Sequence, residues 1–329
     1  MTETVLVGDI GGTNARFALV TVDADAGVNV RALEQVITLA TADYDNIDAA
    51  IRAYLDMAGC TPGAVRSACL ALACPVDGDD IRMTNNHWRF NRTSLMAAVG
   101  LERLKLVNDF TAQALGMLCV EDHELIAVGG GTSMPGVARL VIGPGTGLGV
   151  GCLVPSSQGW IPLPGEGGHT SLAPQDELED AILLGFRQRY GRVSVERVLC
   201  GQGLLELYQI MADIRGVTAE LDSPAAITAA AQSDPQSLAF EVLGRFFRML
   251  GSVAGDDVLA MGTRGGVYLC GGILPRVREL FLNSEFRAAF EYKGRFESYL
   301  QAVPVWLCVA DNPGLLGAAA ALQNPEVRG

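Results

Sequence analysis

Two glycine-rich segments carry residue types that bind phosphate without a basic side chain. The first runs from Asp9 to Arg16 as Asp-Ile-Gly-Gly-Thr-Asn-Ala-Arg, and the second runs from Gly143 to Gly149 as Gly-Pro-Gly-Thr-Gly-Leu-Gly. Apolar runs flank both segments, so each is predicted to be the tip of a hairpin. Because a tip without bulky side chains lets successive backbone N–H groups approach phosphate oxygens, its donors come from the main chain. The two hairpins therefore predict a duplicated scaffold around one triphosphate.

Two better-known phosphate motifs do not fit these segments. A Walker A loop needs a Gly-Lys pair, but the only lysines are Lys105 and Lys293, and neither follows a glycine. A dinucleotide-binding fingerprint needs G-x-G-x-x-G between a strand and a helix, whereas the glycines of residues 143–151 alternate and lead into another strand. What remains is the hairpin phosphate loop of actin-like and sugar-kinase ATPases, which residues 9–16 resemble.

Length, charge and cysteine content narrow the class of protein. With 329 residues, the chain exceeds what one hydrophobic core usually organises, so two lobes are expected. A formal net charge of −13 disfavours a surface that binds nucleic acid. No apolar run approaches the roughly 18 residues that span a bilayer, and the first strand begins too early for a signal peptide. The cysteines are scattered without a C-x-x-C pair, which favours reduced core thiols. We therefore expect a cytosolic protein that binds neither membranes nor nucleic acid.

Apolar patterns predict an α/β first lobe. Strands are expected at 28–39, 69–73 and 104–107, and helices at 44–57 and 111–118. Asn108 and Asp109 directly follow the strand at 104–107. Since open α/β sheets bind ligands at the carboxyl ends of their strands, we expect the first lobe to present Asp9 and Asp109 at comparable positions.

The second half of the chain predicts a larger lobe rich in helices. The segment 121–137 is glycine-rich and polar and is predicted to be a loop. Helices are expected throughout 176–261, and strands at 267–270 and 303–309. The alanine-rich helix that opens near Pro313 is predicted to pack back on the first lobe.

Seven segments together are similar to the bacterial glucokinase family. They are Asp9–Arg16, Asn108–Phe110, Gly143–Gly149, Pro164–His169, Ser194–Arg197, Gly271–Ile273 and Asn312–Gly317. The resemblance covers essentially the whole chain, and residues 286–290 and 293–296 add matches outside the site. The ROK sugar kinases share the Glu-x-Gly-His element but place a cysteine-rich zinc motif shortly after it. Residues 170–191 contain no cysteine, so we expect no zinc site.

The resemblance implies a two-lobed actin-like ATPase (ribonuclease H-like) fold with a cleft between the lobes. The small α/β lobe would comprise residues 1–118 and 311–329, and the larger α+β lobe residues 119–310. The implied activity is a glycolytic one, transfer of the γ-phosphoryl group of ATP to the 6-hydroxyl of D-glucose, with Mg²⁺ as cofactor. The resemblance also implies a cytoplasmic homodimer.

The resemblance assigns roles to individual residues. Asp109 is expected to be the general base that takes the proton of the attacking hydroxyl. The sugar shell is expected to be Asn108, Asp109, Glu166, His169 and Glu196. ATP is expected to contact Asp9, Gly11, Gly12, Thr13, Asn14, Gly145, Thr146 and Gly147 through its phosphates, with Asp9 as an outer-shell Mg²⁺ partner, and Gly271, Gly272 and Ile273 through its adenosine.

Each assignment has a purely structural alternative. Asp9 can cap its own turn, and Asp109 can cap the helix that follows it. Glu196, followed by Arg197 in a predicted helix, can form an ordinary surface ion pair. The turn at 271–273 can be a tight turn without a ligand, and Arg16 can reach either a phosphate or an acidic neighbour.

Two other functions remain compatible with the residues. A kinase for another hexose, such as fructose or mannose, would use the same groups, and so would one that takes another donor such as polyphosphate. A non-catalytic sugar sensor or actin-like ATPase switch would use the same two hairpins for binding. The retained Asp109 favours an enzyme over a sensor.

Overall fold

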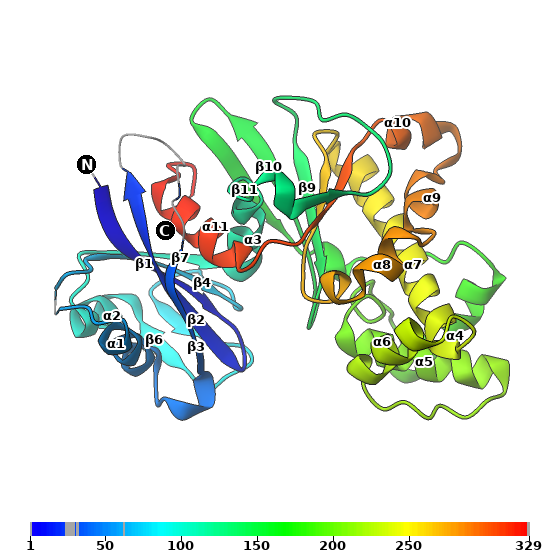
Figure 1. The fold of residues 1–329 in the computed structure, drawn as a ribbon, viewed down its shortest axis with the longest axis horizontal. Helices are drawn as coiled ribbons and strands as arrows, with labels where there is room; N and C mark the ends of the chain where they lie inside the picture. The colour runs from blue at the N-terminus through cyan, green and yellow to red at the C-terminus, as the bar shows by residue number, and fades with distance from the viewer. Residues whose placement is uncertain (1, 24–29, 31–32, 62, 328–329) are drawn as a thin grey trace. The chain divides into compact units, whose positions relative to one another are not determined.

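The structure is a computed structural model that describes residues 2–23, 30, 33–61 and 63–327. The chain divides into two compact units (Figure 1). Unit 1 comprises Met1–Asp122, Leu153–Pro164 and Ala310–Gly329, and unit 2 comprises His123–Cys152 and Gly165–Val309. Residues 153–164 fall in unit 1, where the predicted division had placed them in the larger lobe. They contact the end of the chain, because the Asn324 side chain donates to the Trp160 carbonyl at 2.7 Å and Ser156 bonds Glu326.

The described part of unit 1 is built on a five-stranded sheet with the order β3-β2-β1-β4-β7. The strands are β1 (Thr2–Ile10), β2 (Asn14–Asp23), β3 (Glu34–Ala40), β4 (Ser67–Leu72) and β7 (Arg103–Asn108). Strands β1, β4 and β7 are parallel, so Ile10, Leu72 and Asn108 end at one edge. The strand predicted from residue 28 is described from Glu34, while residues 24–29 and 31–32 lie outside the described chain.

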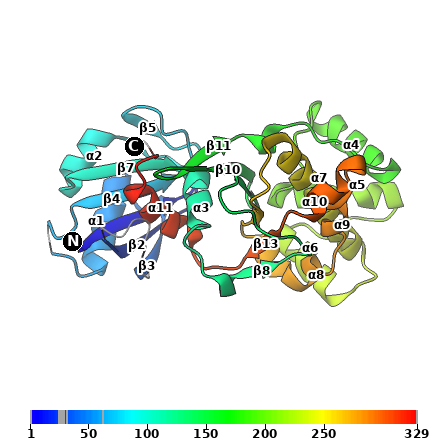
Figure 2. The same cartoon turned by 90° about the horizontal axis from the view of Figure 1, so that it is seen from above.

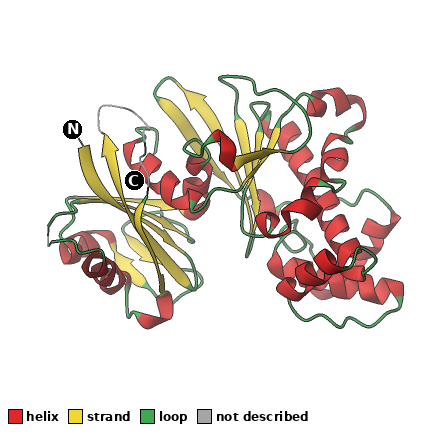
Figure 3. Ribbon diagram, in the orientation of Figure 1, coloured by secondary structure: helices red, strands yellow, loops and turns green. Residues whose placement is uncertain are grey.

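Four helices, a short 3₁₀ turn and a two-stranded ribbon complete the described part of unit 1 (Figure 3). They are α1 (Ile47–Met57), α2 (Arg92–Val99), α3 (Asp109–Gly116), α11 (Pro313–Gln323), η1 (Thr41–Asp43), β5 (Asp80–Arg82) and β6 (Arg89–Asn91). Helix α1 starts later than predicted because the Asn46 side chain accepts the Ala49 N–H at 3.0 Å and caps it. Helix α3 starts two residues earlier than predicted, directly at Asp109.

Helix α11 lies against α3, as both views show (Figures 1 and 2). The prediction that the last helix packs on the first lobe is confirmed. The contact depends on glycine, because a Cβ on Gly317 would collide with the Ala112 carbonyl and one on Gly116 with the Pro313 carbonyl. Lys105 on β7 fixes the far end of α11, since its ammonium donates to the carbonyls of Ala321 at 2.8 Å and Val327 at 2.6 Å.

The second sheet has six strands among the described residues, in the order β11-β10-β9-β12-β13-β8. They are β8 (Leu125–Ala127), β9 (Arg139–Pro144), β10 (Leu148–Ser156), β11 (Gly159–Gly165), β12 (Val267–Leu269) and β13 (Val305–Cys308). The prediction that 121–137 is only a loop is wrong. A 3₁₀ turn, η2 (Asp122–Glu124), and β8 lie there, and β8 is a three-residue edge strand whose position depends on pairing with β13.

Helices make up most of unit 2, and those of 176–261 confirm the predicted helical stretch. The helices are α4 (Glu177–Tyr190), α5 (Gly201–Arg215), α6 (Pro224–Ser233), α7 (Leu238–Met261), α8 (Arg278–Leu282), α9 (Phe286–Glu291) and α10 (Glu297–Gln301), with 3₁₀ turns η3 (Gly167–His169), η4 (Leu274–Val277) and η5 (Gly294–Phe296). The long α7 contributes to the hydrophobic core of unit 2, where its Phe246, Phe247 and Leu250 are buried.

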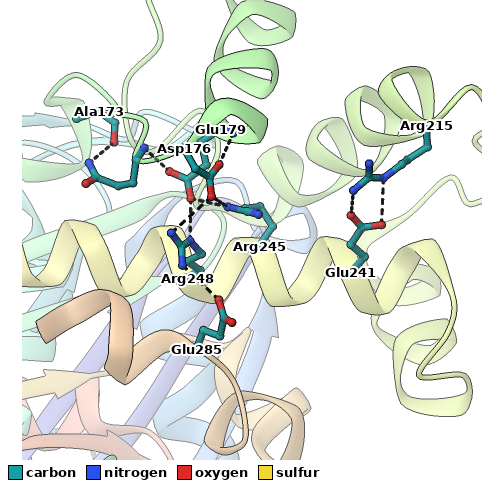
Figure 4. Close-up of polar contacts among 9 residues, drawn as sticks. Ala173, Asp176, Glu179, Arg215, Glu241, Arg245, Arg248 and Glu285 are labelled. Atoms are coloured by element: carbon teal, nitrogen blue, oxygen red, sulfur yellow. Dashed lines mark hydrogen bonds and ion pairs between the residues drawn. The ribbon is translucent and has the colours of Figure 1, made fainter. Parts of the chain in front are cut away.

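An ionic cluster joins α4 to α7 (Figure 4). Arg245 on α7 binds Asp176 at 2.6 Å and Glu179 at 3.0 Å, and Arg248 adds a contact to Glu179 at 3.4 Å and one to Glu285 at 3.3 Å. Glu179 is buried, so its charge requires these partners. Asp176 also caps α4 by accepting the Glu179 N–H at 2.9 Å. The cluster therefore fixes the start of one helix against the middle of another.

Candidate active site

The tip between β1 and β2 presents two backbone donors. Gly12 and Thr13 stand at this tip, and among the described residues neither of their N–H groups has a hydrogen-bond partner. The Gly11 N–H, predicted as a third donor, instead donates to the Asn14 carbonyl at 2.9 Å and closes the turn. The loop is therefore able to offer two adjacent N–H groups to phosphate oxygens.

Asp9 lies just before this tip, at the carboxyl end of β1. Arg16, its register partner on β2, approaches its Oδ2 at 4.0 Å and donates to the Thr38 hydroxyl at 3.2 Å. Burial raises the pKa of Asp9, and the arginine counteracts this only in part. The start of α11 contributes to that burial, because a Cβ on Gly314 would lie 3.4 Å from the Asp9 carboxylate. Arg16 thus has the acidic neighbour that was one of its two predicted partners.

Asp109 is the first residue of α3, but it does not cap that helix. The cap is Asn108, whose side-chain oxygen accepts the N–H groups of Phe110 at 3.0 Å and Thr111 at 3.3 Å. The capping alternative for Asp109 is therefore wrong. Its Oδ1 accepts the Phe110 N–H at 2.8 Å, and the Asn108 side chain also forms a hydrogen bond to this carboxyl.

Burial raises the pKa of Asp109 to about 6, the Phe110 N–H opposes the rise, and the negative charge of Asp9 adds to it. A carboxylate with this pKa is still ionised at neutral pH, yet it is a stronger base than an unperturbed aspartate. Its pKa lies close to neutral pH, which favours efficient proton abstraction at that pH.

The tip between β9 and β10 has a different set of hydrogen bonds from the tip between β1 and β2. The Gly145 N–H, another predicted donor, donates to the Gly147 carbonyl at 2.8 Å, and the Gly145 carbonyl accepts the Gly201 N–H at 2.9 Å. Thr146 and Gly147 keep N–H groups that have no partner among the described residues. The Glu196 carboxylate accepts the Leu148 N–H at 2.8 Å and so lies directly against this tip.

Glu196 is in a turn, not in the predicted helix, and it makes no ion pair with Arg197 in the described chain. Its own N–H donates to the Gly168 carbonyl at 2.9 Å, which joins this turn to the Gly-rich segment 165–169. The Arg197 guanidinium instead lies 4.2 Å from the centre of the Tyr190 ring. The surface ion-pair alternative for Glu196 is therefore wrong.

Glu166 and His169 flank the same Gly-rich segment. Their side chains are 88% and 59% exposed, and the His169 ring nitrogen lies 3.8 Å from the Glu166 carboxylate. Gly167 and Gly168 let the backbone pack closely, since a Cβ on Gly167 would lie 2.7 Å from the Val150 side chain. The structure thus groups Glu166, His169 and Glu196 beside the second hairpin.

The turn Gly271–Ile273 follows β12 at the same edge of the second sheet. Gly271 has a φ of +86°, which favours glycine, and a Cβ there would lie 2.5 Å from the Pro144 carbonyl. This turn therefore packs against the end of β9, next to the second tip.

Two residues around the first tip were not assigned a role from the sequence. Thr41 and Asn86 bond carbonyl oxygens of the tip across 29 and 75 residues of chain. The paired asparagines at 85–86 are a turn signal, and nothing in the local pattern indicates where such a turn packs.

Comparison with known proteins decides the family. The glucokinase family profile matches residues 6–325. The chain belongs to the glucokinase family. Its curated relatives include glucokinases of Chromohalobacter salexigens, 52% identical over 99% of this chain and 100% of that protein, and of Neisseria meningitidis, 47% identical over 97% and 94%.

Solved glucokinases confirm the predicted actin-like ATPase fold. The crystal structure of a glucokinase from an Antarctic psychrotroph superposes with a TM-score of 0.87 at 37% identity, covering 98% of this chain and 99% of that one. Two more distant structures share the fold. One is a Balamuthia mandrillaris glucokinase in complex with glucose, which has a TM-score of 0.79 at 20% identity and covers 100% of this chain and 94% of that one. The other is a ROK glucokinase of Streptomyces griseus in complex with glucose and AMPPNP, which has a TM-score of 0.59 at 19% identity and covers 96% of this chain and 98% of that one. Within the described part of this glucokinase-family chain, no helix combines the length and apolarity needed to cross a membrane.

Proposed function

We propose that this protein transfers the γ-phosphoryl group of ATP to the 6-hydroxyl of D-glucose, giving glucose 6-phosphate and ADP. The observation that carries the proposal is the Asp109 carboxyl, half-buried directly after β7 with its pKa raised to about 6. The identity to curated glucokinases over nearly the whole chain supports the same reaction.

Asp109 acts as the base in this proposal. Its carboxylate accepts the proton of the 6-hydroxyl as the oxygen forms its bond to phosphorus, and ADP leaves with the electrons of the broken P–O bond. Asp109 is half-buried at the start of α3, so a sugar hydroxyl is able to reach its carboxyl. Asn108 fixes the position of Asp109 because it caps the helix that starts there.

The remaining hydroxyls of glucose require matched polar groups. Asn108, Glu166, His169 and Glu196 together supply amide, carboxylate and imidazole groups that donate to and accept from hydroxyls. An epimer would leave one such group unpaired, which is the physical basis for discrimination among hexoses. The exposure of Glu166 and His169 leaves both side chains accessible to a sugar.

We assign nucleotide binding mainly to backbone groups. The N–H groups of Gly12, Thr13, Thr146 and Gly147 would hold phosphate oxygens, and the turn Gly271–Ile273 would contact adenosine. Mg²⁺ would neutralise charge on the phosphates. Asp9, a half-buried carboxylate with the Arg16 guanidinium 4.0 Å away, fits an outer-shell partner of such an ion.

A coupled assay tests the proposal. Wild-type protein with Mg²⁺ should form hexose 6-phosphate with glucose at a higher kcat/KM than with fructose or mannose, and with ATP rather than polyphosphate. A preference for fructose or for polyphosphate would show that the proposed specificity is wrong. If no combination of sugar and phosphoryl donor gives a product, the proposal is rejected. The cytoplasmic homodimer is part of the proposal, and sedimentation of the purified protein tests the dimer.

A further inference from the structure

Three successive carbonyl groups of the β1–β2 tip are bonded from outside the hairpin. The Asn86 side-chain amide donates to the Gly11 carbonyl at 2.9 Å, and the Thr41 hydroxyl donates to the Gly12 carbonyl at 2.9 Å. The Thr41 N–H then donates to the Thr13 carbonyl at 3.0 Å. The tip is therefore constrained on one side through its acceptors.

This constraint determines where the donors of the tip point. A trans peptide is planar, and its C=O and N–H point in opposite directions. The Gly11 carbonyl shares a peptide with the Gly12 N–H, and the Gly12 carbonyl shares one with the Thr13 N–H. Asn86 and Thr41 therefore direct both N–H groups away from themselves, to the side where the described residues offer no acceptor.

Both side chains are themselves held in place. The Asn86 oxygen accepts the Trp88 N–H at 2.9 Å, and the fully buried Trp88 ring donates to the Tyr44 carbonyl at 3.0 Å. Thr41 is 3% exposed at the start of η1. The turn at residues 85–86 also contacts the tip directly, because a Cβ on Gly12 would lie 3.0 Å from the Asn85 carbonyl oxygen. The two bonds thus connect the tip to the core of unit 1.

We propose that Asn86 and Thr41 are positioning residues for the nucleotide, which aim the Gly12 and Thr13 N–H groups at the terminal phosphates of ATP without contacting ATP themselves. This inference rests on the proposed function, since it names how that function's phosphate donors are oriented. A purely structural role would lower stability and affect both substrates alike. A positioning role selectively weakens the binding of the phosphate-bearing substrate.

The test compares four variants. Thr41→Val keeps the shape of the side chain and removes the hydroxyl, Thr41→Ser restores the hydroxyl, and Asn86→Leu removes the amide. Tyr54→Phe is the matched control, because it removes one buried side-chain bond to a carbonyl of the same unit, the 3.1 Å contact to Gln35, away from the tip. Each protein is checked by thermal unfolding, by KM for Mg·ATP and for glucose, and by calorimetric titration with Mg·AMPPNP and separately with glucose.

Loss of one orienting bond should raise the KM for Mg·ATP and the Kd for Mg·AMPPNP about tenfold in Thr41→Val and Asn86→Leu. The KM for glucose should stay within about twofold, Thr41→Ser should restore wild-type nucleotide binding, and Tyr54→Phe should lower only stability. The inference is overturned if nucleotide binding is unchanged in both variants, or if glucose binding falls in parallel and serine does not restore it. A wild-type protein that does not phosphorylate glucose would reject the proposed function, and the Mg·AMPPNP titration would still decide the role of Asn86 and Thr41.

Discussion

The two glycine hairpins look alike in the sequence but are supported by different chemistry. Neutral side chains hold the first tip through its carbonyls, and two half-buried carboxylates, Asp9 and Asp109, lie in the same unit. A carboxylate, Glu196, lies against the second tip and occupies the Leu148 N–H. The first hairpin thus shares its unit with the proposed base, whereas the second lies against a residue proposed to bind sugar. The repeated motif therefore offers the same kind of donor twice, each time beside an acidic residue with a different proposed role.

The largest expected effect comes from removing the proposed base of unit 1, Asp109. Asp109→Asn should lower kcat about 10³-fold, because general-base catalysis is lost while the shape of the side chain is kept. Glucose binding should remain measurable by calorimetry. Turnover within tenfold of wild type would reject the assignment of Asp109.

The same variant should be more stable than wild type at neutral pH. The folded-state pKa of Asp109 is raised, so the folded protein favours the protonated form, and stability falls as pH rises from about 4 through about 6. Replacing the ionised, desolvated carboxylate should add about 1–2 kcal/mol to the free energy of unfolding at pH 8. Asp257 in unit 2, whose pKa burial raises to about 7, is the matched control. Asp257→Asn should also stabilise the protein but leave kcat unchanged.

A second pair of variants separates the two hairpins directly. Gly12→Ala places a Cβ 3.0 Å from the Asn85 carbonyl oxygen, so the first tip must shift, and the KM for Mg·ATP should rise about 10- to 100-fold. Gly147→Ala places a Cβ 2.5 Å from the Glu196 carboxylate and should displace that side chain. Its main effect should be on the KM for glucose. If Gly147→Ala leaves the KM for glucose unchanged, the assignment of Glu196 to the sugar is wrong.

The smallest effect on catalysis is expected in the ionic cluster of unit 2 (Figure 4). Arg245→Met removes the closest cation of buried Glu179 and should lower stability by about 2–4 kcal/mol with kcat within about twofold. Arg215→Met breaks an exposed pair with Glu241 and should leave the melting temperature nearly unchanged. Thermal unfolding of both variants measures this difference in stability. Equal losses of stability would show that burial does not decide the strength of these ion pairs.

The sequence predicted the features that depend on local pattern. The β1–β2 and β9–β10 hairpins, the buried strand β4 and the final helix all follow from apolar periodicity, glycine and proline. The boundary at α3 was missed because Asn108 and Asp109 are both good capping residues, and only the hydrogen bonds show that Asn108 caps. The support from Thr41 and Asn86 was not predictable, because it joins distant segments through single side-chain bonds.

The central claim is that Asp109 is a base of raised pKa, and the pH dependence of kcat/KM for glucose at saturating Mg·ATP tests it most directly. The ionised carboxylate is required, so activity should rise with pH and level off above an apparent pKa of about 6, falling about tenfold for each pH unit below it. A profile that stays flat down to about pH 4.5, as an unperturbed aspartate would give, would contradict the claim.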